Sequence, residues 1–160
     1  MLRIITSGLL ITGCAFSLFV FGSAMGLFGK KITVYPFSGF SGQLLHEGEP
    51  AAYAKVTREW DWDGTKHEEV TSADKDGYFS FEPVRVETRE SLSEFVSSQR
   101  VTVNFKMEDY SIWVCSKRDK GIYGEFGSEP VNLKCELTQE LFDVDLIKGL
   151  AVSNCTWDKE

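Results

Sequence analysis

From residue 32 onward, apolar and polar residues alternate in short segments that are separated by Gly, Pro and Asp-Gly turns. A period of two is that of a β-strand with one buried face, and Asp-Gly tolerates the positive φ of a tight turn. Strands about 8–12 residues apart with turns between them predict a sandwich. The predicted strands are 32–37, 42–45, 54–62, 78–81, 100–106, 110–116 and 131–137.

Residues 31–160 are consistent with one domain. With 42% hydrophobic and 26% charged residues, the composition is that of a globular protein. We expect an all-β, immunoglobulin-like sandwich of about seven strands. Residues 87–99 predict a helical turn or a long loop, and residues 117–129 a polar, Gly-rich connection.

Residues 4–28 contain no charged side chain, with Arg3 before them and Lys30 and Lys31 after them. Such a segment is long enough to span a bilayer of ~30 Å at ~1.5 Å rise per residue. We therefore expect a hydrophobic helix within residues 1–30, which serves as a signal peptide or as a membrane anchor.

Three interpretations of this segment remain open. Residues 11–14 (Ile-Thr-Gly-Cys) match the pattern of a lipoprotein signal, in which Cys14 receives the lipid, although the tract after Cys14 stays apolar. An uncleaved anchor over residues 4–28 has the right length, but its balanced flanking charges orient it weakly. Alternatively, Met25 is the true start and the export signal does not exist.

The chain has four cysteines: Cys14, Cys115, Cys135 and Cys155. If Cys14 is lipidated or lies in the membrane, the other three allow one disulfide and one free thiol. In an oxidising compartment we pair Cys135 with Cys155, which would attach the C-terminal tail to the domain. The alternative is three reduced, buried thiols. No paired cysteines or histidines with the spacing of zinc ligands occur.

The net charge of −7 understates the acidity of the domain, because Arg3, Lys30 and Lys31 lie in or beside the N-terminal segment. An acidic domain repels a phosphate backbone, so we expect no nucleic-acid partner, and a basic protein fits the charge better. Gly-rich phosphate loops and the common hydrolase motifs are missing from the sequence. We therefore expect a non-enzymatic protein without a cofactor or a small-molecule substrate.

Asp74 and Asp76 before Gly77 raise the question of calcium. Val84 and Val86 stand where further oxygen ligands would be needed. A tight turn is therefore the preferred interpretation of these two aspartates.

The candidate partner-binding residues are Arg58, Trp60 and Trp62, which share one face of a strand because successive side chains alternate. If Val56 faces the core, the same face points inward and the tryptophans pack near the end of the strand. If the strand projects beyond the sandwich, these residues form an exposed hot spot for a protein partner.

One longer pattern carries a resemblance. Gly42-Gln43-Leu44, the segment 48–56 (GEPAAYAKV) and the segment 71–81 (TSADKDGYFSF) resemble the carboxypeptidase-regulatory-like and transthyretin-like group of β-sandwiches. The resemblance implies that the Asp-Gly turn directs Phe79 and Phe81 into the core. Tyr53 departs from the pattern, since that group usually has Gly there.

More narrowly, the chain resembles an uncharacterised bacterial family over about residues 28–157. The resemblance rests on Ile112-Trp113, the Cys-Glu-Leu-Thr segment 135–138 and Cys155-Thr156-Trp157. It supports pairing Cys135 with Cys155, and it implies a fold without an established function. Some relatives of this kind stand beside secreted antibacterial effectors, where a small envelope protein acts as the immunity partner.

We therefore expect a protein-binding domain of the bacterial cell envelope that faces the periplasm. The most specific version of this hypothesis is an immunity protein that acts against a secreted toxin. The first alternative is a structural lipoprotein or an accessory subunit of an envelope assembly. The second is a carbohydrate-binding module, which would require Trp60 and Trp62 to be exposed.

Overall fold

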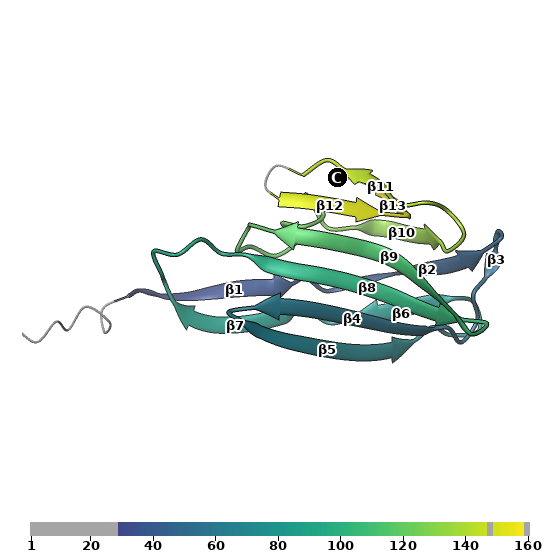
Figure 1. Ribbon diagram of the computed structural model, residues 1–160, viewed down its shortest axis with the longest axis horizontal. Coiled ribbons are helices and arrows are strands. Elements are labelled where there is room, and N and C mark those ends of the chain that lie inside the picture. Colours follow the sequence, from purple (N-terminus) through teal and green to yellow (C-terminus); the bar gives the residue numbers. More distant parts are fainter. Residues whose placement is uncertain (1–28, 147–148, 159–160) are drawn as a thin grey trace, which may run out of the picture.

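The computed structural model describes residues 29–146 and 149–158, which form strands and loops (Figure 1). The prediction of an all-β domain is confirmed, and no helix in these two ranges could cross a membrane. The strands are β1 (Lys31–Phe37), β2 (Phe40–His46), β3 (Glu49–Pro50), β4 (Lys55–Trp62), β5 (Thr65–Ser72), β6 (Tyr78–Phe81), β7 (Val84–Arg89), β8 (Ser97–Phe105), β9 (Glu108–Lys117), β10 (Val131–Glu136), β11 (Phe142–Val144), β12 (Gly149–Ser153) and β13 (Cys155–Asp158).

Three expectations concern residues that lie outside the described ranges. These are the hydrophobic helix within residues 1–30, the lipidation of Cys14 and the alternative start at Met25. They stay predictions.

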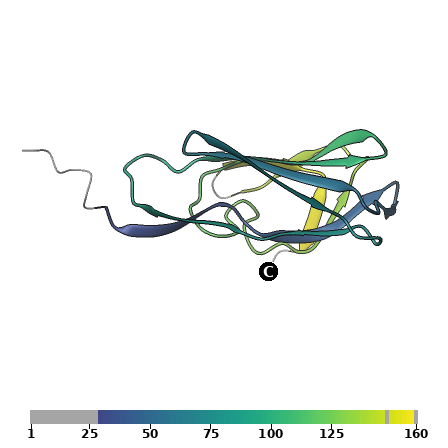
Figure 2. The ribbon, with the colours of Figure 1, turned by 90° about the horizontal axis from the view of Figure 1, so that it is seen from below.

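The strands form two facing layers, which Figure 2 shows edge-on. One layer is a six-stranded sheet in the order β11-β12-β9-β8-β4-β5. The other contains a five-stranded sheet, β13-β10-β2-β3 with β6 also paired to β2, and a two-stranded sheet of β1 and β7. The pairs are antiparallel except that of β10 with β2, where the backbones approach so closely that a Cβ on Gly42 would lie 2.7 Å from the carbonyl oxygen of Leu133.

The β1–β7 sheet continues the β2–β6 ladder beyond a break. β1 leads into β2 through Ser38 and Gly39, and β6 leads into β7 through Glu82 and Pro83. Proline cannot donate a ladder hydrogen bond, and a Cβ on Gly39 would lie 2.7 Å from the Pro83 ring. At this break the backbone of Ser38 turns toward the interior, where it is completely buried.

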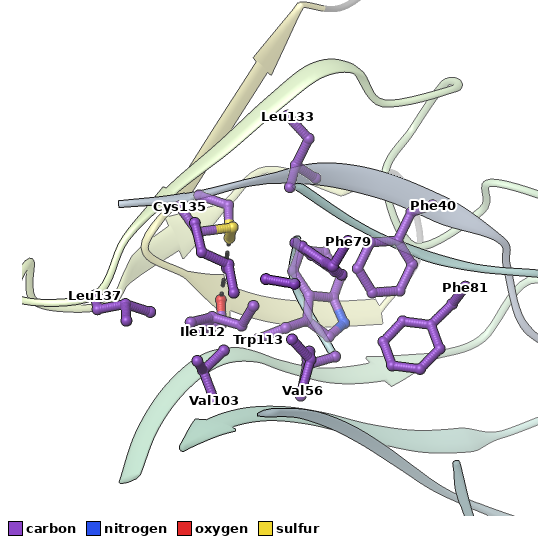
Figure 3. Close-up of a cluster of buried hydrophobic side chains, with 14 of the residues drawn as sticks. Phe40, Val56, Phe79, Phe81, Val103, Ile112, Trp113, Leu133, Cys135 and Leu137 are labelled. Atoms are coloured by element: carbon purple, nitrogen blue, oxygen red, sulfur yellow. Dashed lines mark hydrogen bonds between the residues drawn. A yellow bond between two sulfur atoms is a disulfide. The ribbon is translucent and has the colours of Figure 1, made fainter. Parts of the chain in front are cut away.

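Apolar side chains from both layers meet in the core (Figure 3). Phe40, Phe79 and Phe81 form a cluster of aromatic rings from β2 and β6, with centroids 5.6–6.2 Å apart. The register of β8 against β9 shifts after Val101, and this irregularity allows the consecutive residues Ile112 and Trp113 both to be buried.

Cys135 on β10 and Cys155 on β13 lie directly opposite each other and form a disulfide, as the sequence analysis expected. It attaches the last described strand to the five-stranded sheet. Cys115 is a buried free thiol. Burial raises the pKa of Cys115 to about 12, so this thiol is unreactive at neutral pH.

Two details of the expected strand pattern are wrong. The described residues contain thirteen strands, where about seven were expected, because the sequence pattern missed β3, β5, β7 and the three short strands near the C-terminus. β5 was missed because nearly all of its residues are exposed, so apolar alternation is absent. In the range 87–99, β7 and β8 occupy the two ends and residues 90–96 form the loop between them, with no helical turn.

Removing the disulfide tests its contribution to stability. We expect the double substitution Cys135→Ala/Cys155→Ala to lower the free energy of unfolding by about 3 kcal/mol, since the disulfide closes a chain segment with a sequence separation of 20. Urea unfolding of both proteins with and without reductant measures this. Reductant should destabilise the wild type and leave the double variant unchanged, whereas a wild type insensitive to reductant would contradict the pairing.

Candidate functional site

The face of β4 that carries Arg58, Trp60 and Trp62 points inward. Val56 is fully buried, Arg58 is 2% exposed, and the two tryptophans toward the end of the strand are half-buried. The first of the two interpretations is therefore confirmed. The hypothesis that Arg58 contributes to an exposed hot spot is wrong, because β4 does not project beyond the sandwich at this position.

The Arg58 guanidinium is surrounded by aromatic rings. Its central carbon lies 4.6 Å from the ring centroid of Phe81, 5.4 Å from that of Phe37 and 5.5 Å from that of Trp60. Arg58 Nε donates a hydrogen bond to Glu69 Oε2 at 3.0 Å. Burial lowers the pKa of Arg58, and Glu69 opposes this shift. The cation is thus held by one ion pair and by cation–π contacts.

The rings of Trp60 and Trp62 also have intramolecular partners. Trp60 is stacked on His67 with a centroid distance of 5.0 Å, and it contacts Phe37 edge-on at 6.4 Å. Trp62 packs beside Phe95 at 6.3 Å. This packing argues against the open aromatic platform that a carbohydrate-binding module requires.

Substitution of Arg58 tests its role in packing. We expect Arg58→Ala to lower the free energy of unfolding by about 2 kcal/mol or more, since it removes buried packing together with the ion pair. Arg85→Ala is the matched control, because Arg85 is exposed on β7, and it should change stability by less than about 0.5 kcal/mol. Urea unfolding measures both, and equal effects would contradict the assignment.

The Cys-Glu-Leu-Thr segment 135–138 has a structural role. Glu136 Oε1 and Oε2 accept hydrogen bonds at 3.0 Å from the backbone N–H groups of Glu47 and Gly48, respectively, in the turn between β2 and β3. Oε1 also accepts the Thr138 hydroxyl at 2.8 Å. Both turn residues have positive φ, 55° and 82°. Glu136 therefore fixes this turn against β10.

The pKa of Glu136 reflects these contacts. Burial raises this pKa, but the hydrogen bonds from Thr138, Gly48 and Glu47 together lower it below its ordinary value. A carboxylate with a lowered folded-state pKa stabilises the fold above its unfolded-state pKa, and this contribution disappears as the pH falls through the folded-state value.

Glu136→Gln should therefore be less stable than the wild type at neutral pH. We expect the difference to shrink as the pH falls below about 4.3, the ordinary pKa of Glu, and to vanish below the lowered pKa of Glu136. Unfolding midpoints across this pH range check it, with the exposed Glu140→Gln as the control. A difference that does not depend on pH would contradict the ionic origin of the effect.

Asp74 organises a turn. Its Oδ1 accepts hydrogen bonds from the backbone N–H groups of Asp76 and Tyr78, both at 2.9 Å. This is the arrangement that the sequence analysis preferred over calcium. In the described residues no group of three or more His, Cys, Asp or Glu side chains could hold a metal ion.

A buried polar cluster, consisting of Ser38, Gln99, Lys117 and Glu125, lies between the layers beside Arg58. Lys117 Nζ lies 2.7 Å from Glu125 Oε2, and both side chains are 0% exposed. Ser38 belongs to the break between β1 and β2, Gln99 to β8 and Lys117 to the end of β9. Glu125 comes from the connection 118–130, which enters the interior together with Phe126.

Both oxygens of the Glu125 carboxylate accept several hydrogen bonds. Oε1 accepts the backbone N–H of Ser38 at 2.7 Å and the side-chain amide of Gln99 at 3.2 Å. Oε2 accepts the Ser38 hydroxyl at 2.8 Å and contacts Lys117. Lys117 Nζ also donates to the backbone oxygen of Tyr35 at 2.8 Å. The charges are therefore fully partnered, as burial requires.

Because this cluster is closed to solvent, it cannot meet an external substrate or partner. One surface that is open to solvent is a groove of about 830 Å³ on the outer face of the six-stranded sheet. Its lining includes Glu59 and Arg100, whose chain neighbours Arg58 and Gln99 point inward, so alternation places the groove on the opposite face.

Two rows of directly paired residues cross the floor of this groove. One row is Asp143, Val152, Val114, Arg100 and Glu59. The other is Leu150, Ser116, Ser98, Asp61 and Lys66.

The groove combines an apolar strip with an excess of acid. The β9–β12 side presents valines and leucines, among which Leu150 is 80% exposed. Four acidic side chains but only two basic ones line the whole groove: Glu59, Asp61, Asp143 and Asp145 against Lys66 and Arg100. An apolar strip within an acidic border is suited to a basic protein surface.

The described residues thus form a β-sandwich with an open outer groove and a closed polar interior. The chain belongs to the family described as Domain of unknown function (DUF6795), whose model matches residues 40–140. No curated protein and no solved structure matches the chain. The transthyretin-like topology and the bacterial origin stay predictions.

Sequence reasoning did not single out Lys117, Glu125 or the groove. Lys117 was detectable, because it continues the inward alternation of Trp113 and Cys115 along β9. Glu125 was not detectable, because the segment that contains it has the composition of a polar connection. The groove depends on pairings between strands that are far apart in the sequence, including β11 and β12, which the sequence pattern did not predict.

Proposed function

We propose that this chain is a non-enzymatic protein-binding domain of the cell envelope, attached to a membrane through residues 1–30 and facing the periplasm. The most specific version of this proposal is that the protein is an immunity protein that neutralises a secreted antibacterial effector. The observation that carries the proposal is the groove on the outer face of the six-stranded sheet, where apolar side chains lie within an acidic border.

The chemistry of the groove favours a basic protein partner. Its apolar strip supplies a patch whose burial stabilises a complex, at roughly 25 cal/mol per Å² of apolar surface. The excess of acidic side chains attracts a basic partner and repels nucleic acid. The groove lies on a sheet of six paired strands, so little ordering entropy would be lost on binding.

A matched pair of leucine substitutions tests the proposal. Leu150→Lys removes an apolar contact in the groove and weakens its excess of negative charge, whereas Leu92→Lys makes the same change at a fully exposed residue outside the groove lining. Each full-length protein is used to capture proteins from its own host, followed by mass spectrometry and a direct binding measurement with the recovered protein.

We expect near-stoichiometric recovery of one basic secreted protein by the wild type and by Leu92→Lys. Its affinity for Leu150→Lys should fall at least about tenfold, which corresponds to ~1.4 kcal/mol. Equal affinities for both variants would show that the groove is not the binding surface.

Deletion of the gene distinguishes immunity from a structural role in the envelope. Deletion cells that are killed beside toxin-producing kin support immunity. Recovery of envelope components alone, together with an envelope defect in pure culture, would overturn the immunity proposal in favour of a structural lipoprotein.

A further inference from the structure

The Lys117–Glu125 pair differs from the other ion pairs of the described residues, in each of which at least one side chain is 45% exposed or more. Removing a carboxylate and an ammonium from water costs several kcal/mol per ion before their attraction is counted. The pair also places a primary amine in direct contact with a carboxyl group, at 2.7 Å, with no water between them. An amine and a carboxyl held in contact can form an amide.

We propose that Lys117 and Glu125 condense into an intramolecular isopeptide bond after the chain has folded. The bond joins Lys117 Nζ to the carboxyl carbon of Glu125, and one water molecule leaves. This inference concerns the interior and does not depend on the proposed partner-binding function.

The cluster supplies a group for each part of the reaction. Transfer of one proton from Lys117 to Glu125 Oε2 gives a neutral amine beside a carboxylic acid. The amine attacks the carboxyl carbon, and negative charge develops on Oε1. Oε1 already accepts the Ser38 backbone N–H at 2.7 Å and the Gln99 amide at 3.2 Å, two donors positioned as in an oxyanion hole.

Ser38 Oγ is placed to carry the second proton. It lies 3.4 Å from Lys117 Nζ and donates to Glu125 Oε2 at 2.8 Å. It can therefore accept a proton from the attacking nitrogen while it gives its own proton to Oε2, which leaves as water. One C–N bond forms and one C–O bond breaks. Nothing is oxidised or reduced, so no other reactant is needed.

Folding supplies the driving force for this condensation. Groups held in contact react as if at effective concentrations of roughly 10⁵–10⁸ M, which lowers the barrier to amide formation. The reaction also replaces two buried charges with one neutral amide. Since both side chains are 0% exposed, water has little access for the reverse reaction.

Peptide mass spectrometry of the full-length protein tests the bond. Trypsin does not cleave after a lysine whose amine is acylated, so the peptide 107–118 should remain joined to the peptide 121–134. The joined species should weigh less than the two peptides together by one water molecule. Fragmentation should place the link between Lys117 and Glu125.

Two variants serve as controls. Lys117→Arg keeps the positive charge but has no primary amine, so its peptides should separate and keep the full mass. Ser38→Ala should still form the bond, but roughly tenfold to a hundredfold more slowly after synthesis, because the proton relay is lost.

Recovery of the unlinked wild-type peptides, 107–117 and 121–134, at full mass would overturn the proposal. A loss of water located at other residues would also overturn it. An unchanged rate in Ser38→Ala would overturn the assignment of the relay to Ser38.

Discussion

The fold depends on how the break between β1 and β2 is filled. There Ser38 leaves the ladder, and its backbone N–H points to Glu125 while its backbone oxygen faces Arg58. Unpaired backbone groups in the interior are costly, so the break persists only if charged side chains satisfy them. Glu125 in turn requires Lys117 as its partner. One interruption in a strand thus accounts for the charged residues at the centre of this sandwich.

The same arrangement determines where function can reside. The inner face of the six-stranded sheet is occupied by the core and by the polar cluster, which leaves its outer face available for contact. The six-stranded sheet packs its inner face against the apolar core and the buried Lys117–Glu125 pair, so it presents its outer groove in one shape. A preformed shape lowers the entropy lost on binding, which supports the proposal that this domain binds another protein.

Several motifs that resemble functional signatures prove to be structural. The Cys-Glu-Leu-Thr segment forms the disulfide and fixes a turn through Glu136. The C-terminal Cys-x-Trp places Trp157 against Trp113, with a centroid distance of 6.0 Å. On β4, Arg58 is buried among the rings of Phe37, Trp60 and Phe81. These sequence motifs therefore reflect the packing requirements of the sandwich.

The sequence by itself determined the all-β class and the positions of the central strands, because alternation and turn residues act locally. The family resemblance supported the inward face of Phe79 and Phe81 and the pairing of Cys135 with Cys155, and the structure contains both. Only the tertiary structure decided that Arg58 is buried, that Lys117 meets Glu125, and that β11 and β12 complete the groove. These features depend on which distant segments face each other. The connection that carries Glu125 and the exposed edge strands show no hydrophobic periodicity that would reveal them.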